Sequence, residues 1–119
     1  MSSWLQLRHW ENSIRLFAHT VRVTENNAEA HNNLGTALKR KGRLKEAIRQ
    51  YTAALQANPG HAKAHNNLGN ALKRQGRFDE AIYHYSQSLR VRPGSAVVLN
   101  NLGNALRRKG RLEEAVACY

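Results

Sequence analysis

Residues 28–61 read AEAHNNLGTALKRKGRLKEAIRQYTAALQANPGH, and the chain then repeats much of this pattern. The motif HNNLG at residues 31–35 returns as HNNLG at 65–69 and as LNNLG at 99–103. The Gly-Arg pair that begins at Gly42 recurs at the same constant interval, at Gly76 and Gly110. A fixed period of about 34 residues predicts an array of stacked structural repeats.

Each repeat unit is predicted to form two helices. From Ala28 onward, apolar and small residues fall on one side of a helical wheel and polar residues on the other. Gly42 can end this helix because glycine adopts the left-handed conformation without a side-chain cost. A second helix is expected over 43–58, and Pro59 with Gly60 ends it. One such hairpin cannot bury both of its faces, so neighbouring hairpins must stack.

The order of large and small residues resembles that of the tetratricopeptide repeat (TPR) family. In the first copy the signature positions hold Leu34, Gly35, Leu38, Ala47, Tyr51, Ala54 and Pro59. In the second copy they hold Leu68, Gly69, Leu72, Ala81, Tyr85, Ser88 and Pro93. In the third copy they hold Leu102, Gly103, Leu106, Ala115 and Tyr119. The resemblance implies an all-α fold, an α-α superhelix that is a right-handed solenoid of antiparallel helix pairs.

Residues 1–119 are expected to form a single TPR array. Its expected parts are the closing helix of a partial repeat (1–27), repeat 1 (28–61), repeat 2 (62–95) and a truncated repeat 3 (96–119). Phe17 lies one full period before Tyr51 and so occupies the same repeat position. Neither end carries the polar cap that a solenoid needs. The sequence therefore reads as a fragment of a longer array, and its uncapped ends predict self-association.

The composition is strongly basic, with 19 Lys and Arg against 8 Asp and Glu and a net charge of +11. This charge favours partners or surfaces that are negative. The single cysteine, Cys118, excludes an intramolecular disulfide. No apolar run is long enough to span a bilayer, and no signal-peptide pattern follows Met1. We expect a soluble chain, either cytoplasmic or the soluble tail of a bacterial membrane protein, and its localisation stays open.

Two adjacent asparagines recur in every opening helix, although asparagine is a poor helix former. An Asn amide both donates and accepts hydrogen bonds, which suits the backbone of an extended peptide. Repeated along the predicted concave side, these amides would form a ladder. The candidate peptide-binding residues of this groove are Asn32, Asn33, Thr36, Asn66, Asn67, Asn70, Asn100, Asn101 and Asn104.

This ladder resembles that of the O-linked N-acetylglucosamine transferases, in which asparagines before a Leu-Gly pair hold substrate backbone. Asn33, Asn67 and Asn101 occupy the matching place, so the resemblance implies that they contact peptide. The alternative is that one Asn of each pair bonds across to the next opening helix and only fixes the stacking. Another TPR mode, a clamp for the C-terminal carboxylates of chaperones, matches this sequence only at Asn67.

Cations gather around the three predicted hairpin turns, and we call this set the basic ridge. Its members are Lys39, Arg40, Arg43, Lys73, Arg74, Arg77, Arg107, Arg108 and Arg111. Stacking would place them along one edge of the array. Cations at the ends of the opening helices also favour the helix dipole, which is the alternative explanation for them. As a functional surface, the ridge predicts steering of an acidic peptide or docking on anionic lipid head groups.

Together these features predict a protein–protein interaction scaffold that binds an extended, acidic peptide segment in the Asn-lined groove. The opening residues also resemble the entry repeat of bacterial membrane proteins in which a glycosyltransferase-like portion precedes a TPR tail. A substrate-presenting or regulatory tail of such a protein is therefore an alternative, with membrane contact only through flanking segments. Nucleic-acid binding by the basic ridge is disfavoured, because the concave arc carries no aromatic residue on which a base could stack.

No catalytic, cofactor or metal site is expected in this sequence. His61 and His65 are four residues apart, a metal-compatible spacing, but no carboxylate or thiol joins them. The glycines follow the repeat and form no phosphate-binding loop. We therefore expect no enzyme within these residues and no cofactor.

Overall fold

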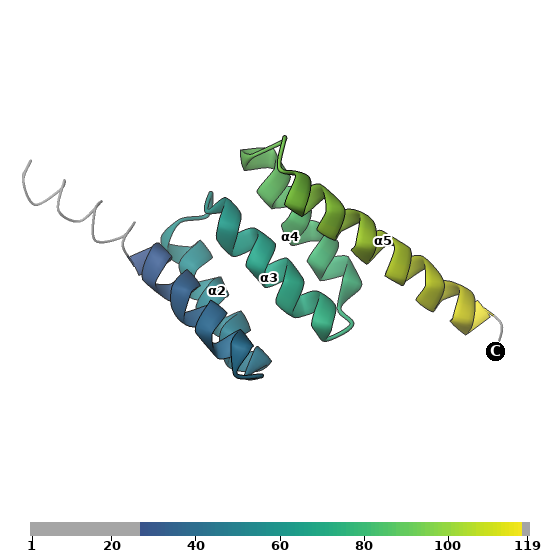
Figure 1. Ribbon diagram of the computed structural model, residues 1–119, viewed down its shortest axis with the longest axis horizontal. Coiled ribbons are helices and arrows are strands. Elements are labelled where there is room, and N and C mark those ends of the chain that lie inside the picture. Colours follow the sequence, from purple (N-terminus) through teal and green to yellow (C-terminus); the bar gives the residue numbers. More distant parts are fainter. Residues whose placement is uncertain (1–26, 118–119) are drawn as a thin grey trace, which may run out of the picture.

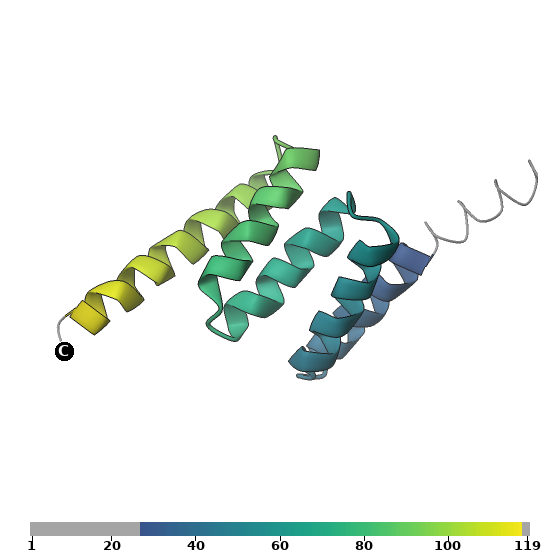
Figure 2. The ribbon, with the colours of Figure 1, turned by 180° about the vertical axis from the view of Figure 1, so that it is seen from behind.

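The computed structural model describes residues 27–117, which form a stack of helices with no strand among them. A helix over 27–40 comes first, followed by α2 (Leu44–Ala57), α3 (Ala62–Arg74), α4 (Phe78–Val91) and α5 (Ala96–Ala117). Successive helices run antiparallel and lie side by side (Figures 1 and 2). α2 packs against α3, and α4 packs against both α3 and α5. The predicted all-α, TPR-like solenoid is confirmed, and the predicted closing helix within 1–27 lies outside the described residues.

Glycine ends the first helix of each complete hairpin. Gly42 has φ +79° and Gly76 has φ +77°, so both adopt the left-handed conformation that the sequence predicts. The residue after each glycine folds back over the helix end, and the Arg43 N–H donates to the Leu38 carbonyl at 3.0 Å. These bonds satisfy carbonyl groups that the helix end would otherwise leave without a partner.

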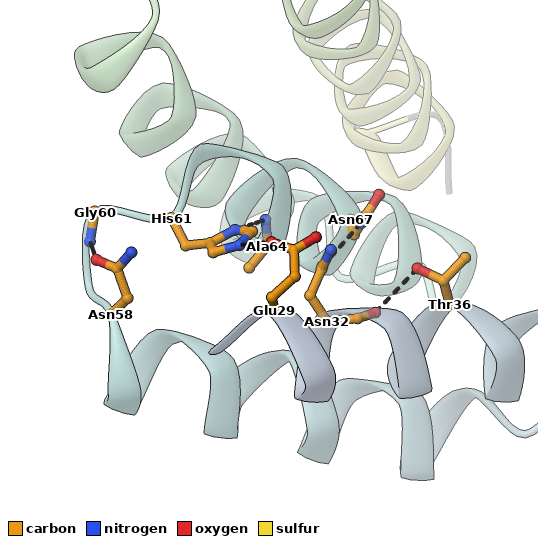
Figure 3. Close-up of polar contacts among 8 residues, drawn as sticks. All are labelled: Glu29, Asn32, Thr36, Asn58, Gly60, His61, Ala64 and Asn67. Carbon is orange, nitrogen blue, oxygen red and sulfur yellow. Dashed lines mark hydrogen bonds and ion pairs between the residues drawn. The ribbon is translucent and has the colours of Figure 1, made fainter. Parts of the chain in front are cut away.

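A different connection joins one hairpin to the next. Asn58 leaves the helical region before Pro59, and its side-chain Oδ1 accepts a hydrogen bond from the Gly60 N–H at 3.1 Å (Figure 3). His61 then caps α3, because its Nδ1 accepts from the Ala64 N–H at 3.1 Å. The side chains at this turn therefore set where α3 begins.

Each hairpin is closed by a tyrosine that lies against a glycine. A Cβ on Gly35 would stand 2.7 Å from Tyr51 Cε1, and one on Gly69 would stand 2.6 Å from Tyr85 Cε1. Both tyrosines are fully buried. The two repeated glycines are therefore required because an aromatic ring occupies the space of a side chain.

α3 is the most enclosed helix, because α2 covers one side and α4 the other. One continuous core joins them, formed by Ala47, Tyr51, Leu68, Ala71, Leu72, Ala81, Tyr85, Val98 and Ala105. Among the described residues, no helix combines the length and the apolar character that a membrane span requires.

The third hairpin turn, predicted at Gly110, is not formed. α5 continues through Gly110 to Ala117, and Gly110 does not have a positive φ. Continuing α5 keeps its backbone hydrogen bonds without the cost of a new helix nucleus. Arg107, Arg108 and Arg111 of the basic ridge therefore lie along a helix and not around a turn.

Candidate functional site

The paired asparagines form hydrogen bonds between neighbouring opening helices. Asn67 Nδ2 donates to Asn32 Oδ1 at 3.0 Å, and Figure 3 shows the two amides facing each other. Asn101 Nδ2 donates to Asn66 Oδ1, also at 3.0 Å. We call these two bonds the rungs of the asparagine ladder. The second Asn of each later repeat donates to the first Asn of the repeat before it, so the ladder holds the stack together.

The asparagines differ in how far they remain accessible. Asn32 is only 4% exposed, so it takes part in the ladder as a buried hydrogen-bond acceptor. Asn66, Asn67 and Asn101 are half-buried, and Asn33 is exposed. Asn100, the sixth member of the three pairs, is exposed as well. An Asn amide has two N–H donors and a carbonyl oxygen, so one rung bond leaves the half-buried amides with further hydrogen-bonding capacity.

The polar residue one turn beyond each asparagine pair binds the buried tyrosine of its own hairpin. Thr36 Oγ1 donates to the Asn32 carbonyl at 3.1 Å, so the Tyr51 hydroxyl donates to Thr36 Oγ1 at 3.0 Å. The Tyr85 hydroxyl donates to Asn70 Oδ1 at 2.5 Å. Burial raises the pKa of Tyr85 to about 12, which keeps the donor protonated. Both pairs have the same sequence separation, and this constant spacing could have indicated the contact in the sequence.

Asn104 holds the same position in α5 and is half-buried. Tyr119, the tyrosine that corresponds to it in the repeat, lies outside the described residues. The structure therefore explains Thr36 and Asn70 as supports of the hairpin core, and it leaves Asn104 as the member of this set without such a contact among residues 27–117.

Five members of the basic ridge influence one another across the repeats. Burial lowers the pKa of Lys39, and the charges of Arg74 and Arg40 lower it further. Burial also lowers the pKa of Lys73, followed by the charges of Arg108 and Arg74. We call Lys39, Arg40, Lys73, Arg74 and Arg108 the cationic row. Within residues 27–117 none of the five forms an ion pair, so their mutual repulsion is not compensated.

Unlike the cationic row, the arginines at the two turns that form have carboxylate partners. Arg43 pairs with Glu46 at 2.7 Å and Arg77 pairs with Glu80 at 2.6 Å, each three residues along the same hairpin. The hydrogen bond from Arg77 lowers the pKa of Glu80. The basic ridge thus contains turn arginines with local carboxylate partners as well as a cationic row without them.

Two of the hollows beside α3 are relevant to the site. The smaller, of about 110 Å³, lies beside the ladder and is lined in part by Lys63, Asn66 and Val97. The larger, of about 370 Å³, lies where α2 and α4 meet α3 and is lined in part by His65 and His84.

The histidines serve three different structural roles. His61 caps α3 and its Nε2 lies 3.0 Å from Glu29 Oε2. His65 donates from Nε2 to the Pro59 carbonyl at 2.9 Å, so its Nδ1 must accept from the Nδ1–H of His84 at 3.0 Å. Burial, followed by the charge of His65, lowers the pKa of His84 to about 4. Sequence reasoning missed this pair, although His31 and Gln50 make the same contact one repeat earlier.

The family model of the tetratricopeptide repeat matches residues 4–62, 32–96 and 66–119. The chain belongs to the TPR family. A crystal structure of MamA protein matches this TPR chain with 31% identity and a TM-score of 0.69, covering 79% of this chain and 51% of the MamA chain. A MamA mutant matches with 28% identity and a TM-score of 0.66, covering 82% and 74%. A comparison with curated proteins returned no match.

This TPR chain thus spans about half of the length of the first MamA chain. The TPR repeats and the MamA-like architecture support the general function of a protein–protein interaction scaffold. The TPR fold typically serves as such a scaffold and not as a catalyst.

Proposed function

We propose that this TPR chain is a protein-interaction scaffold that holds an extended acidic peptide across the helix 27–40, α3 and α5. The observation that carries this proposal is the cationic row, because its charges lie together without acidic partners among the described residues. A carboxylate brought near Lys39 and Lys73 would favour their charged forms and relieve the repulsion. An acidic ligand is therefore the one that gains most from this surface.

The asparagine ladder supports the same orientation of the peptide. The rungs connect one opening helix to the next, so the half-buried Asn67 and Asn101 succeed one another along the stack. Their remaining donors and acceptors suit a peptide backbone that runs in this direction. Asn67 and Arg74 are separated by about 10 Å along α3. An arginine and a glutamate side chain together can span that distance, so backbone and side chains of one peptide can be held at once.

The test is the affinity for a fluorescein-labelled ten-residue peptide of alternating Glu and Gly, measured by anisotropy, with the Gln-Gly peptide as its neutral counterpart. We expect the acidic peptide alone to bind, with an affinity that falls as salt rises. Arg74→Gln should weaken binding roughly threefold to tenfold. Arg77→Gln is the matched control, because Arg77 already has Glu80 as its partner, and it should leave the affinity within about twofold.

Equal binding of the two peptides, or an equal loss in both arginine variants, contradicts the proposal. Titrations with vesicles of anionic lipid and with a single-stranded oligonucleotide complete the test. If either binds more tightly than the acidic peptide at physiological salt, the row serves that ligand and the proposal is overturned.

The role of the ladder is tested separately by Asn67→Ala. This variant keeps the cationic row and removes one amide from the predicted path of the peptide backbone. We expect a weaker affinity with an unchanged salt dependence, measured where circular dichroism shows the variant to be folded. An unchanged affinity would assign Asn67 to the stacking of the repeats alone.

A further inference from the structure

Two polar side chains that line the smaller hollow beside the asparagine ladder keep hydrogen-bond donors while their oxygen atoms are occupied. Asn66 Oδ1 accepts the rung from Asn101, so within residues 27–117 the two N–H groups of the Asn66 amide remain without a partner. The Ser95 hydroxyl accepts from the Val98 N–H at 3.4 Å and keeps its own O–H as a donor. A ligand in this hollow therefore meets donors, which favours a ligand that carries acceptor atoms.

Two cations reach the same hollow from different elements. Lys63 stands in the first turn of α3, and Arg92 directly follows the end of α4. Both also line an adjoining hollow of about 240 Å³, so the two hollows meet beside these cations. Both side chains are exposed, and within residues 27–117 neither forms an ion pair. Positive charge together with unused donors selects an anion with several oxygen atoms.

A carboxylate lies close to this region and must be taken into account. Among the described residues, Glu29 is the only acidic residue that lines either hollow, and it lines the adjoining one. Its Oε2 lies 3.0 Å from His61 Nε2 (Figure 3). An anion in the smaller hollow therefore faces Lys63 and Arg92 without an acidic side chain in the same lining.

We propose that the smaller hollow binds a phosphate monoester, the side chain of a phosphoserine in the peptide that lies on the ladder. This inference rests on the proposed peptide function and adds a second specificity to it. The hollow of about 110 Å³ has room for several water molecules, which a phosphate group replaces. A phosphate carries three strong acceptor oxygens and about two negative charges. It can accept from Asn66 and Ser95 while it pairs with the two cations, whereas a carboxylate has fewer oxygen atoms to share among these donors.

The position of this hollow along α3 gives the bound peptide a second edge. Lys63 lies four residues before Asn67, about 6 Å along the helix axis, whereas Arg74 of the cationic row lies beyond Asn67 on the other side. Successive side chains of an extended peptide point in opposite directions. When one set points to the cationic row, the residues between them point toward the smaller hollow. In a peptide of alternating Glu and Gly, a phosphoserine that replaces a central glycine is thus directed at Lys63 and Arg92.

The experiment uses three fluorescein-labelled peptides, in which serine, phosphoserine or aspartate replaces one central glycine of the Glu-Gly peptide. Anisotropy with the full chain should show that phosphoserine tightens binding about tenfold relative to serine, and that aspartate does so less than about threefold. Lys63→Gln combined with Arg92→Gln should lower the ratio between the phosphoserine and serine peptides to about twofold or less. Both side chains are exposed, so the double variant should fold, which circular dichroism verifies.

Arg90→Gln is the matched control, because Arg90 is exposed, lies two residues before Arg92 and lines neither hollow. It removes the same charge as Arg92→Gln and should keep the ratio of about tenfold. Inorganic phosphate, added at constant ionic strength, distinguishes a phosphoserine side chain from free phosphate. It should compete with the phosphoserine peptide only at millimolar concentration and leave the affinity of the serine peptide unchanged.

Equal affinities for the serine and phosphoserine peptides overturn the inference, and so does an equal gain from aspartate. A gain that persists in the double variant, or that Arg90→Gln also removes, overturns it as well. Inorganic phosphate that binds as tightly as the phosphoserine peptide would assign the hollow to free phosphate instead. The proposed peptide function fails separately: if only the phosphoserine peptide binds, and does so through Lys63 and Arg92, the hollow is confirmed and the cationic row is not the peptide surface.

Discussion

Replacing Gly69 by alanine tests the central packing contact of the fold. A Cβ at this position would lie 2.6, 2.8 and 3.0 Å from three ring atoms of Tyr85. The ring is fully buried, and its hydroxyl is held by Asn70, so it cannot move aside without losing that bond. We expect Gly69→Ala to destabilise the protein, although alanine is the better helix former.

The magnitude follows from two opposing effects. Overpacking a buried site costs about 1–3 kcal/mol, and a rigid ring approached this closely places Gly69→Ala at the upper end of that range. The gain in helix propensity is about 1 kcal/mol. The net loss in the free energy of unfolding should therefore be about 2 kcal/mol for Gly69→Ala.

Gly103→Ala is the matched control, because it is the same substitution at the same repeat position. No atom lies within 4 Å of the added carbon, so the helix propensity acts alone and the variant should gain about 1 kcal/mol. Urea unfolding followed by circular dichroism at low protein concentration measures both values. If the two variants differ by less than about 1 kcal/mol, the Tyr85 ring is not the reason for the glycine, and the packing argument is refuted.

Three further predictions concern the turn glycines, the histidine pair and the asparagine ladder. Gly76→Ala should cost about 1–2 kcal/mol because φ is +77° there, while Gly110→Ala, inside α5, should stabilise by about 1 kcal/mol in the same urea assay. Lowering the pH from 6.5 to 4 should reduce the free energy of unfolding by about 1–2 kcal/mol, because His84 binds a proton in the unfolded chain but, with a pKa of about 4, does not in the folded chain, and solvent screening of this half-buried ring reduces the full effect. His84→Gln should reduce this dependence, since Gln50 makes the same contact with His31, and the rest should remain because burial also lowers the pKa of His65. Asn67→Ala should cost about 1–2 kcal/mol by leaving a buried carbonyl without its donor.

The period and the turn residues were sufficient to predict most of the fold. Gly42 and Gly76 end their helices in the predicted conformation, and the helix pairs follow the register of the repeat. Gly110 carries the same local signal but lies inside a helix. A turn forms when the helix after it can bury a face against the helix before it, and that condition is tertiary. Identical local sequences can therefore give different structures at different places in the stack.

The functional surface was less predictable than the fold. The asparagine pairs left two roles open, and each rung joins two residues whose separation exceeds the repeat period by one position. This offset arises from the way that neighbouring opening helices meet, which the repeat alone does not specify. Likewise, the sequence identified the basic ridge but could not separate Arg43 and Arg77, which have carboxylate partners, from the cationic row.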